Sequence, residues 1–203
     1  MENKTPFMPE IPEKEPQRQQ YFMAHAKEQL HILEENLGRP LTCCINTFGC
    51  QMNARDSEKL LGILETIGYQ AVETEDADFV LYNTCTVREN ANLRVYGRLG
   101  QLGARKKKHP HMMIALCGCM MQEKEVVEKI KKTYRFVDLI FGTHNIFKLA
   151  ELVSLCLEER LEELEAQGRE DKKPKHKMVV DVWKDTDQIV EDLPVERKYS
   201  FKS

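Results

Sequence analysis

Three cysteines occupy the same kind of position in the sequence, where an apolar stretch gives way to a polar segment that begins a helical pattern. They are Cys50 in "TFGCQMN", Cys85 in "YNTCTVREN" and Cys119 in "LCGCMMQ". A cysteine thiolate binds soft metals, and the N-terminus of a helix stabilises its negative charge. Gly49 and Gly118 directly precede two of the three, so the backbone there can approach a bulky ligand closely. The pattern predicts a shared thiolate site.

The chain has seven cysteines, an odd number, and such cysteines in a reducing compartment more often serve metals or catalysis than disulfides. Cys43 and Cys44 lie inside a predicted strand and Cys156 inside a predicted helix, so we expect these three to pack in the core. Cys117 precedes Cys119 by two residues and shares its strand face. It is either a further core residue or a spare thiol.

The segments that must position the cysteines alternate between strand and helix. Apolar runs predict five strands, at 41–49, 70–75, 77–85, 111–119 and 137–142. Helical periodicity predicts helices at 54–69, 88–110, 123–134 and 145–168, and an amphipathic helix at 19–38 that ends at Gly38. This alternation predicts an α/β fold, a flavodoxin-like doubly wound parallel sheet of about five strands with an N-terminal helix and a C-terminal extension. Residues 178–185 are a candidate for one more strand.

The expected strand order, 2-1-3-4-5, makes the first, third and fourth strands neighbours. Cys50, Cys85 and Cys119 then fall at the carboxyl ends of those strands, where open α/β sheets bind their ligands. Neighbouring strands lie about 4.8 Å apart, so the outer two cysteines would start roughly 10 Å apart at the backbone. Leaning loops and side chains can close that gap around one small inorganic cluster.

Thiolates from three separate loops suit a 4Fe–4S cluster with one iron left open to an exogenous ligand. A zinc site is the less suitable reading, because the chain has no C-x-x-C pair and no histidine spaced as a fourth ligand. His109, His111 and His144 are expected to face solvent. Two alternatives stay open: a metal-free thiol redox or flavodoxin-like binding module that uses Cys117 and Cys119, and a structural zinc domain for interactions.

The amino-acid composition limits the classes of protein to which the chain can belong. The chain has 203 residues, 41% hydrophobic content and a formal net charge of −3, which is typical of a globular domain. It has no apolar run long enough for a membrane span, and residues 1–20 form a polar arm without the apolar region of a secretory signal. We therefore expect a cytoplasmic monomer that does not bind membranes.

A resemblance to a known family is carried by the segments "GCQMNARDSEKL", "NTCTVRENA", "CGCMMQ" and "VDLIFGTHN". The chain resembles the N-terminal domain of the radical-SAM methylthiotransferases, and its motifs are most similar to those of the MiaB type. The resemblance implies that Cys50, Cys85 and Cys119 ligate an auxiliary 4Fe–4S cluster whose open iron receives a sulfur donor. It also implies a tRNA substrate, in which isopentenyl-adenosine beside the anticodon gains a methylthio group at carbon 2. By this resemblance, the cluster-binding domain spans 41–167, after an arm and helix at 1–40.

The family's second 4Fe–4S cluster cleaves S-adenosylmethionine and requires a C-x-x-x-C-x-x-C motif, which this sequence lacks. We therefore expect 168–203 to be a linker and the start of a truncated radical-SAM region. The chain would then be a fragment without catalytic residues for the full reaction, and most tRNA contacts would lie in missing domains.

Several charged and polar residues allow two readings. The basic patch 104–111, "ARKKKHPH", either satisfies the end of a helix or contacts the tRNA backbone. The acidic run 158–171 is expected to be a solvated helix face. Asn53, Asn83 and Arg88 flank the cysteines and either cap helices or hydrogen-bond the cluster.

Overall fold

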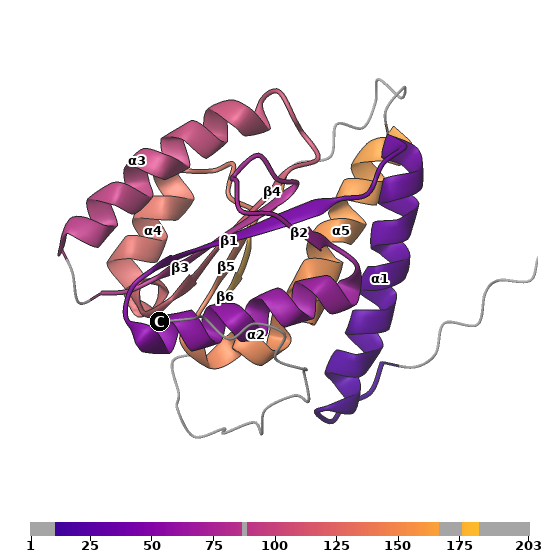
Figure 1. Ribbon diagram of the computed structural model, residues 1–203, viewed down its shortest axis with the longest axis horizontal. Helices are drawn as coiled ribbons and strands as arrows, with labels where there is room; N and C mark the ends of the chain where they lie inside the picture. The colour runs from indigo at the N-terminus through magenta and orange to yellow at the C-terminus, as the bar shows by residue number, and fades with distance from the viewer. Residues whose placement is uncertain (1–10, 87–88, 167–175, 183–203) are drawn as a thin grey trace, which may run out of the picture.

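A parallel β-sheet forms the centre of the computed structural model, which describes residues 11–86, 89–166 and 176–182, and helices cover both faces of the sheet (Figure 1). The strands are β1 (Thr42–Phe48), β2 (Gln70–Ala71), β3 (Phe79–Thr84), β4 (Met113–Gly118), β5 (Leu139–Phe141) and β6 (Val179–Asp181). The α-helices are α1 (Gln17–Leu37), α2 (Gln51–Ile67), α3 (Glu89–Lys106), α4 (Lys124–Thr133) and α5 (Leu149–Ala166). Two short 3₁₀ helices, η1 (Cys119–Gln122) and η2 (Thr143–Lys148), follow β4 and β5.

The strand order is β2-β1-β3-β4-β5-β6, and every pair is parallel. The predicted doubly wound α/β fold and its order 2-1-3-4-5 are confirmed. The candidate strand after residue 178 adds β6 beside β5. All six strands therefore present their carboxyl ends at one edge of the sheet, called here the carboxyl edge, and their starts at the opposite, amino edge.

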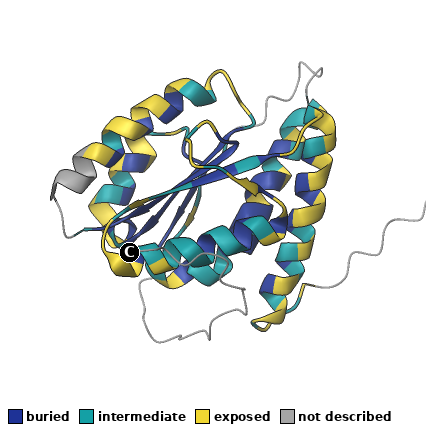
Figure 2. Cartoon of the chain, viewed as in Figure 1, coloured by how far each residue is buried: buried dark blue, intermediate teal, exposed yellow. Residues whose placement is uncertain are grey.

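The central strands β3 and β4 are buried along their whole length because helices cover both of their faces (Figure 2). Alternate residues point to opposite sides, as strand geometry requires. Phe79 and Leu81 join a core formed with α1, α2 and α5, whereas Val80 and Tyr82 join a second core formed with α3 and α4. The molecule therefore has two helical layers, one on each face of the sheet.

Helix α1 lies outside the alternating part of the chain and packs along α5 (Figure 1). Phe22, Ala26, Leu30 and Leu33 form its buried stripe at the spacing of three and four that the sequence predicts. The helix ends at Gly38, whose φ of 70° is left-handed, as expected of a glycine C-cap. The predicted N-terminal helix is thus confirmed.

Several predicted elements differ from the structure in their bounds; helix α3, for example, ends at Lys106 and not just before Pro110. Strand β2 has two residues instead of six, and the last helix begins as the 3₁₀ turn η2 before α5. Helix α2 begins directly after Cys50, three residues earlier than the periodicity indicated. The polar arm up to residue 10, Arg88, and the predictions on 167–175 and 183–203 fall outside the described residues. Among the helices described, none is long and apolar enough to cross a membrane.

Two buried aspartates mark the amino edge, each directly before a strand. Asp78 precedes β3 and accepts hydrogen bonds from both guanidinium nitrogens of Arg39, at 2.8 and 2.6 Å, and from the backbone N–H of Thr42 at 2.9 Å. His111 lies 3.2 Å from the same carboxylate, so the prediction that it faces solvent is wrong. Burial alone would raise the pKa of Asp78, but Arg39, His111 and Thr42 outweigh it and hold the pKa well below the ordinary value.

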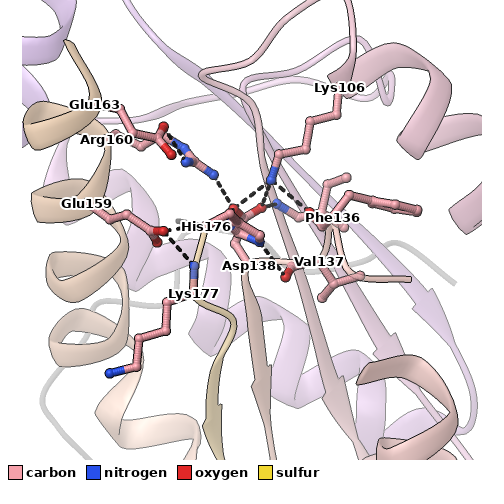
Figure 3. Close-up of polar contacts among 10 residues, drawn as sticks. Lys106, Phe136, Val137, Asp138, Glu159, Arg160, Glu163, His176 and Lys177 are labelled. Carbon is pink, nitrogen blue, oxygen red and sulfur yellow. Dashed lines mark hydrogen bonds and ion pairs between the residues drawn. The ribbon is translucent and has the colours of Figure 1, made fainter. Parts of the chain in front are cut away.

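Asp138 precedes β5 and repeats this arrangement (Figure 3). Its carboxylate accepts hydrogen bonds from Lys106 at 2.6 and 2.5 Å, from the backbone N–H of Ile114 at 2.7 Å, and from the buried Arg160. His176 lies 3.7 Å away, and its Nε2 donates to the carbonyl oxygen of Val137 at 3.1 Å. Burial lowers the pKa of Lys106. The acidic run that begins at residue 158 is therefore not simply a solvated face, because its Arg160 ties α5 to the sheet.

Candidate functional site

The register of the sheet places Cys85 and Cys119 at equivalent positions. Thr84 is paired with Gly118 across β3 and β4, and each of these residues is followed by a cysteine. Phe48 of β1 is paired with Thr84 on the other side, so Cys50 lies one residue farther beyond its strand. Three adjacent parallel strands therefore end in the three predicted cysteines at the carboxyl edge.

Cys50 is the N-cap residue of α2, with extended backbone angles of −90° and −179°. The backbone N–H groups of Asn53 and Met52, which have no partner within the helix, stabilise the thiolate and lower the pKa of the Cys50 thiol. The nearby side chain of Cys85 lowers this pKa further. Cys50 is exposed, Cys85 is buried and Cys119 is partly buried. Thiolate character is thus favoured at the accessible member of the set.

Two glycines keep the surroundings of the cysteines free of side chains. A Cβ at Gly49 would lie 2.9 Å from the Cβ of Cys85 and 2.6 Å from the side-chain nitrogen of Asn53. A Cβ at Gly118 would lie 2.1 Å from the carbonyl oxygen of Thr84, and this glycine has a φ of 99° that other residues rarely adopt. Both glycines are therefore required by close packing of the chain against itself at the carboxyl edge, and the approach of a bulky ligand to them stays a prediction.

A pair of buried asparagines connects the start of α2 with the end of β3. The Asn53 amide donates to the carbonyl oxygen of Thr84 at 3.0 Å, and the Asn83 amide donates to the backbone carbonyl of Asn53 at 2.8 Å. The thiol of Cys50 donates to the side-chain oxygen of Asn53 at 3.5 Å. These bonds fix the Cys50 loop against the Cys85 loop. Neither asparagine acts as a helix cap, since α2 is capped by Cys50 without a side-chain hydrogen bond.

Cys119 opens the 3₁₀ turn η1 rather than an α-helix. Its sulfur accepts a weak hydrogen bond from the hydroxyl of Thr143, in η2, at 3.8 Å. Beneath it, the hydroxyl of Thr84 donates to the carbonyl oxygen of Cys117 at 2.6 Å and joins the ends of β3 and β4. The sequence reasoning missed both threonines. The signal was present in the "NTC" and "FGTH" segments, where a hydroxyl residue adjoins a strand end.

The remaining cysteines are buried, which confirms the core prediction for Cys43, Cys44 and Cys156. Burial raises the pKa of Cys43 to about 12 and raises that of Cys156 further. The side chain of Cys117 is inaccessible, and burial raises its pKa well above the ordinary value. A thiol pair of Cys117 and Cys119 would therefore include one partner that stays protonated and shielded from solvent.

Within the described residues, no group of three or more His, Cys, Asp and Glu side chains converges closely enough to hold a single metal ion. A tight zinc site is therefore not preformed in this part of the chain. A 4Fe–4S cluster has a different requirement, because each cysteine binds a separate iron and the sulfurs stand apart around a bulky cube. Three thiols on adjacent strand ends, a lowered thiol pKa and two side-chain-free glycines fit that larger group.

The chain matches one protein-family model, described as uncharacterized protein family UPF0004, over residues 42–142. That range begins at β1 and ends directly after β5, so it contains all three cysteines of the carboxyl edge. Helix α1, which the sequence reasoning set apart from the main domain, precedes the matched range.

Curated relatives cover more of the chain. It is 63% identical over 181 residues, 89% of its length, to the tRNA-2-methylthio-N(6)-dimethylallyladenosine synthase of Lachnoclostridium phytofermentans. It is 46% identical over 92% of its length to the enzyme of the same name from Acetivibrio thermocellus, and 44% identical over 87% to that of Clostridioides difficile. The chain spans about a third of the length of these relatives, with 36%, 36% and 34% of each covered.

Proposed function

Because the chain belongs to the methylthiotransferase family, through the UPF0004 domain at 42–142 and its similarity to tRNA-2-methylthio-N(6)-dimethylallyladenosine synthases, we propose that its carboxyl edge binds an auxiliary 4Fe–4S cluster. Cys50, Cys85 and Cys119 are its three ligands. The observation that carries this proposal is the register of β1, β3 and β4, which ends each of three adjacent strands in one of these cysteines. When bound, a cluster with three protein ligands supplies one open iron for a sulfur donor.

The chain's own residues prepare the edge for such a group. The free N–H groups at the start of α2 favour the thiolate form of Cys50 and thus its readiness to bind iron. Gly49 and Gly118 let the loops that carry the cysteines pack closely against each other. Asn53 and Asn83 hold the loops of Cys50 and Cys85 together. These contacts hold the loops in a fixed arrangement, which reduces the entropy cost of binding.

We assign the whole protein that contains this domain the reaction named for its relatives, the addition of a methylthio group to dimethylallyl-adenosine in tRNA. The chain has no C-x-x-x-C-x-x-C motif, so a second 4Fe–4S cluster and S-adenosylmethionine would bind outside residues 1–203. Residues 1–203 alone would not complete the reaction. The cytoplasm is the expected compartment because it keeps thiols reduced, and a monomer is the expected form.

Anaerobic reconstitution with ferrous iron and sulfide tests the ligand set. We expect about four iron atoms per chain in the native protein and loss of most of that iron in Cys50→Ala, Cys85→Ala and Cys119→Ala. The matched control is Cys156→Ala, which removes a cysteine buried between α5 and the sheet and should retain the iron. Far-UV circular dichroism of each apo variant separates loss of ligands from loss of fold.

Other outcomes of the same experiment would contradict the proposal. Iron uptake that is indifferent to the three substitutions would place the metal elsewhere. Stoichiometric zinc in place of iron would favour a structural zinc domain. A disulfide between Cys117 and Cys119 in a metal-free native protein would favour a thiol redox module.

A further inference from the structure

The two helical layers of the molecule carry opposite charge. Helices α1, α2 and α5, on one face of the sheet, contain twelve Asp and Glu residues against five Lys and Arg. Helices α3 and α4, on the other face, contain three Asp and Glu residues against eight Lys and Arg. The formal net charge of the whole chain, −3, hides this separation. Such segregation creates a strong local positive potential on an otherwise acidic molecule.

The ends of α3 and α4 lie side by side and concentrate the positive charge. Lys106 donates to the carbonyl oxygen of Phe136 at 2.8 Å, and a Cβ at Gly103 would lie 2.6 Å from the Phe136 ring. The residues next to these contacts are the exposed cations of the basic cluster, defined as Lys107, Lys108, Lys132 and Arg135. None of these four forms an ion pair with a described carboxylate, so their charges are available to a partner.

Further cations extend along the two helices towards the cysteines. Lys129 lies 4.2 Å from the centre of the Tyr96 ring, which in turn stacks on Tyr134 at 5.8 Å, so this ammonium group is held in place. Lys124 begins α4, two residues after the 3₁₀ turn that Cys119 opens. Helix α3 has 18 residues and is therefore about 27 Å long. The positive layer thus reaches from the basic cluster to the carboxyl edge.

We propose that the α3–α4 layer binds the phosphate backbone of RNA and that the basic cluster is its outermost contact. Lys124, Lys129 and the basic cluster, which form no ion pair with a described carboxylate, extend over about 25 Å and match a polyanion with regularly spaced charges. The other cations of the layer contribute less, because Arg98, Arg105, Lys106 and Lys131 are held in ion pairs. An anionic membrane surface fits less well, because peripheral binding requires apolar side chains to insert. The exposed large hydrophobic residues in the described parts are Ile11, Ile32, Met52, Leu155 and Val180, none of them on α3 or α4.

This inference deepens the proposed function by assigning the RNA partner to one face of this domain, and it rests on that function for the kind of RNA. An RNA laid along α3 and α4 would have its bound backbone next to the strand ends that carry Cys85 and Cys119. The contacts are to phosphate and therefore position the RNA without reading its sequence. The basic patch predicted at 104–111 divides accordingly: Lys106 is buried against Asp138, whereas Lys107 and Lys108 face solvent.

The test compares two double variants with the same change in total charge. Lys108→Glu with Arg135→Glu alters the basic cluster, and Lys14→Glu with Lys27→Glu alters two exposed cations on or beside α1. Fluorescence anisotropy measures the binding of a labelled synthetic RNA hairpin across a series of salt concentrations. We expect the first double variant to bind about tenfold more weakly and to reduce the slope of log K against log salt by about 1 to 2. The control double variant should bind nearly as the native chain does.

Three results would overturn the inference. The first is equal weakening of RNA binding by both double variants, and the second is RNA binding by the native chain that is absent or insensitive to salt. The third is a basic-cluster variant that no longer binds phosphatidylserine vesicles but still binds RNA as the native chain does. Iron uptake by the same variants is measured separately. Normal iron uptake with no RNA binding would reject this face and leave the cluster proposal standing. If the native chain takes up no iron but binds RNA, the cluster proposal is rejected and the RNA-binding face stands.

Discussion

The two edges of the sheet are built from different chemistry. At the amino edge, Asp78 and Asp138 each hold a backbone N–H of the neighbouring strand and are surrounded by cations. At the carboxyl edge, the corresponding positions carry thiols, glycines and neutral amides that bond one another. The starts of β3 and β5 are thus fixed by charge pairs, whereas the ends of β1, β3 and β4 are held by neutral hydrogen bonds. Farther along the carboxyl edge, at the end of β6, Asp181 pairs with Lys148. This division concentrates stability on one edge and leaves the other free to receive an anionic group.

The strongest way to break this comparison is Asp138→Asn. The substitution preserves shape but removes the carboxylate that pairs with Lys106 and leaves the buried Arg160 with Glu163 as its acidic partner, so we expect the free energy of unfolding to fall by about 3 kcal/mol. Urea unfolding followed by circular dichroism measures it. The control is Glu128→Gln, which removes an exposed ion pair with Lys131 and should leave the stability nearly unchanged. Equal small losses in both variants would mean that the amino edge does not provide the stability assigned to it.

Gly118→Ala tests whether the carboxyl edge depends on close backbone packing. The added Cβ would meet the Thr84 carbonyl oxygen at 2.1 Å at a φ of 99°, so we expect a loss of about 3 kcal/mol and a displaced Cys119. Gly97→Ala is the matched change on an open part of α3, where a Cβ meets nothing within 4 Å. It should stabilise the helix by about 0.5–1 kcal/mol. Thermal unfolding of both variants measures these changes. A Gly118→Ala variant as stable as the native protein would mean that the carboxyl edge does not depend on close backbone packing.

The ion pairs of Asp78 make the stability of the amino edge depend on pH, which can be measured. Its pKa is lower in the folded protein than in the unfolded chain, so its pairing stabilises the fold above the ordinary carboxyl pKa of about 3.9 and is lost as pH falls below it. We expect a contribution of about 1–2 kcal/mol at neutral pH, since Arg39 is half exposed. Asp78→Asn should therefore have a lower free energy of unfolding than the native protein at pH 7. As pH falls below about 5, this free energy should decline less steeply in the variant than in the native protein. Parallel stability curves for both proteins would argue against this role.

The smallest effect concerns the reactivity of the carboxyl edge. The lowered pKa and exposure of Cys50 predict that iodoacetamide modifies it about tenfold faster at neutral pH than the buried Cys117 in the metal-free folded protein. Mass spectrometry of peptides after timed labelling measures both rates. The rate for Cys50 should rise with pH around a midpoint below the ordinary value of about 8.5. First labelling at Cys117 would reverse the expected order of the two thiols.

Much of the carboxyl edge could be predicted because its signal is local. Each cysteine comes directly after a stretch with an apolar strand pattern. Because the three parallel strands are neighbours in the sheet, the residues at their carboxyl ends lie close together. Gly49 and Gly118 were identified for the same reason. The bond between Asn53 and Thr84 could not be predicted, because it joins residues 31 positions apart through a side-chain orientation that no periodicity records.

The amino edge was largely missed because its partners are distant in the chain. Arg160 meets Asp138 from 22 residues away, and Arg39 meets Asp78 from 39 residues away. The sequence around Arg160 is dense in glutamate and indicated a solvated face, whereas the structure buries this one cation. A weak signal did exist: both aspartates stand directly before strands that begin with a run of apolar residues, where an isolated charge needs a partner.

The last described strand determines where a continuing polypeptide would be anchored. Because β6 runs parallel to β5, the chain reaches the carboxyl edge at Asp181, whose side chain accepts hydrogen bonds from Asn145 and Lys148 in η2. The same turn contains Thr143, the partner of Cys119. Anything joined beyond Val182 is thus tethered beside the thiols and not on the far side of the sheet. Attachment at this point raises the local concentration of whatever the polypeptide carries near the thiols, so two reactive centres on one polypeptide would meet without diffusing through the cell to find each other.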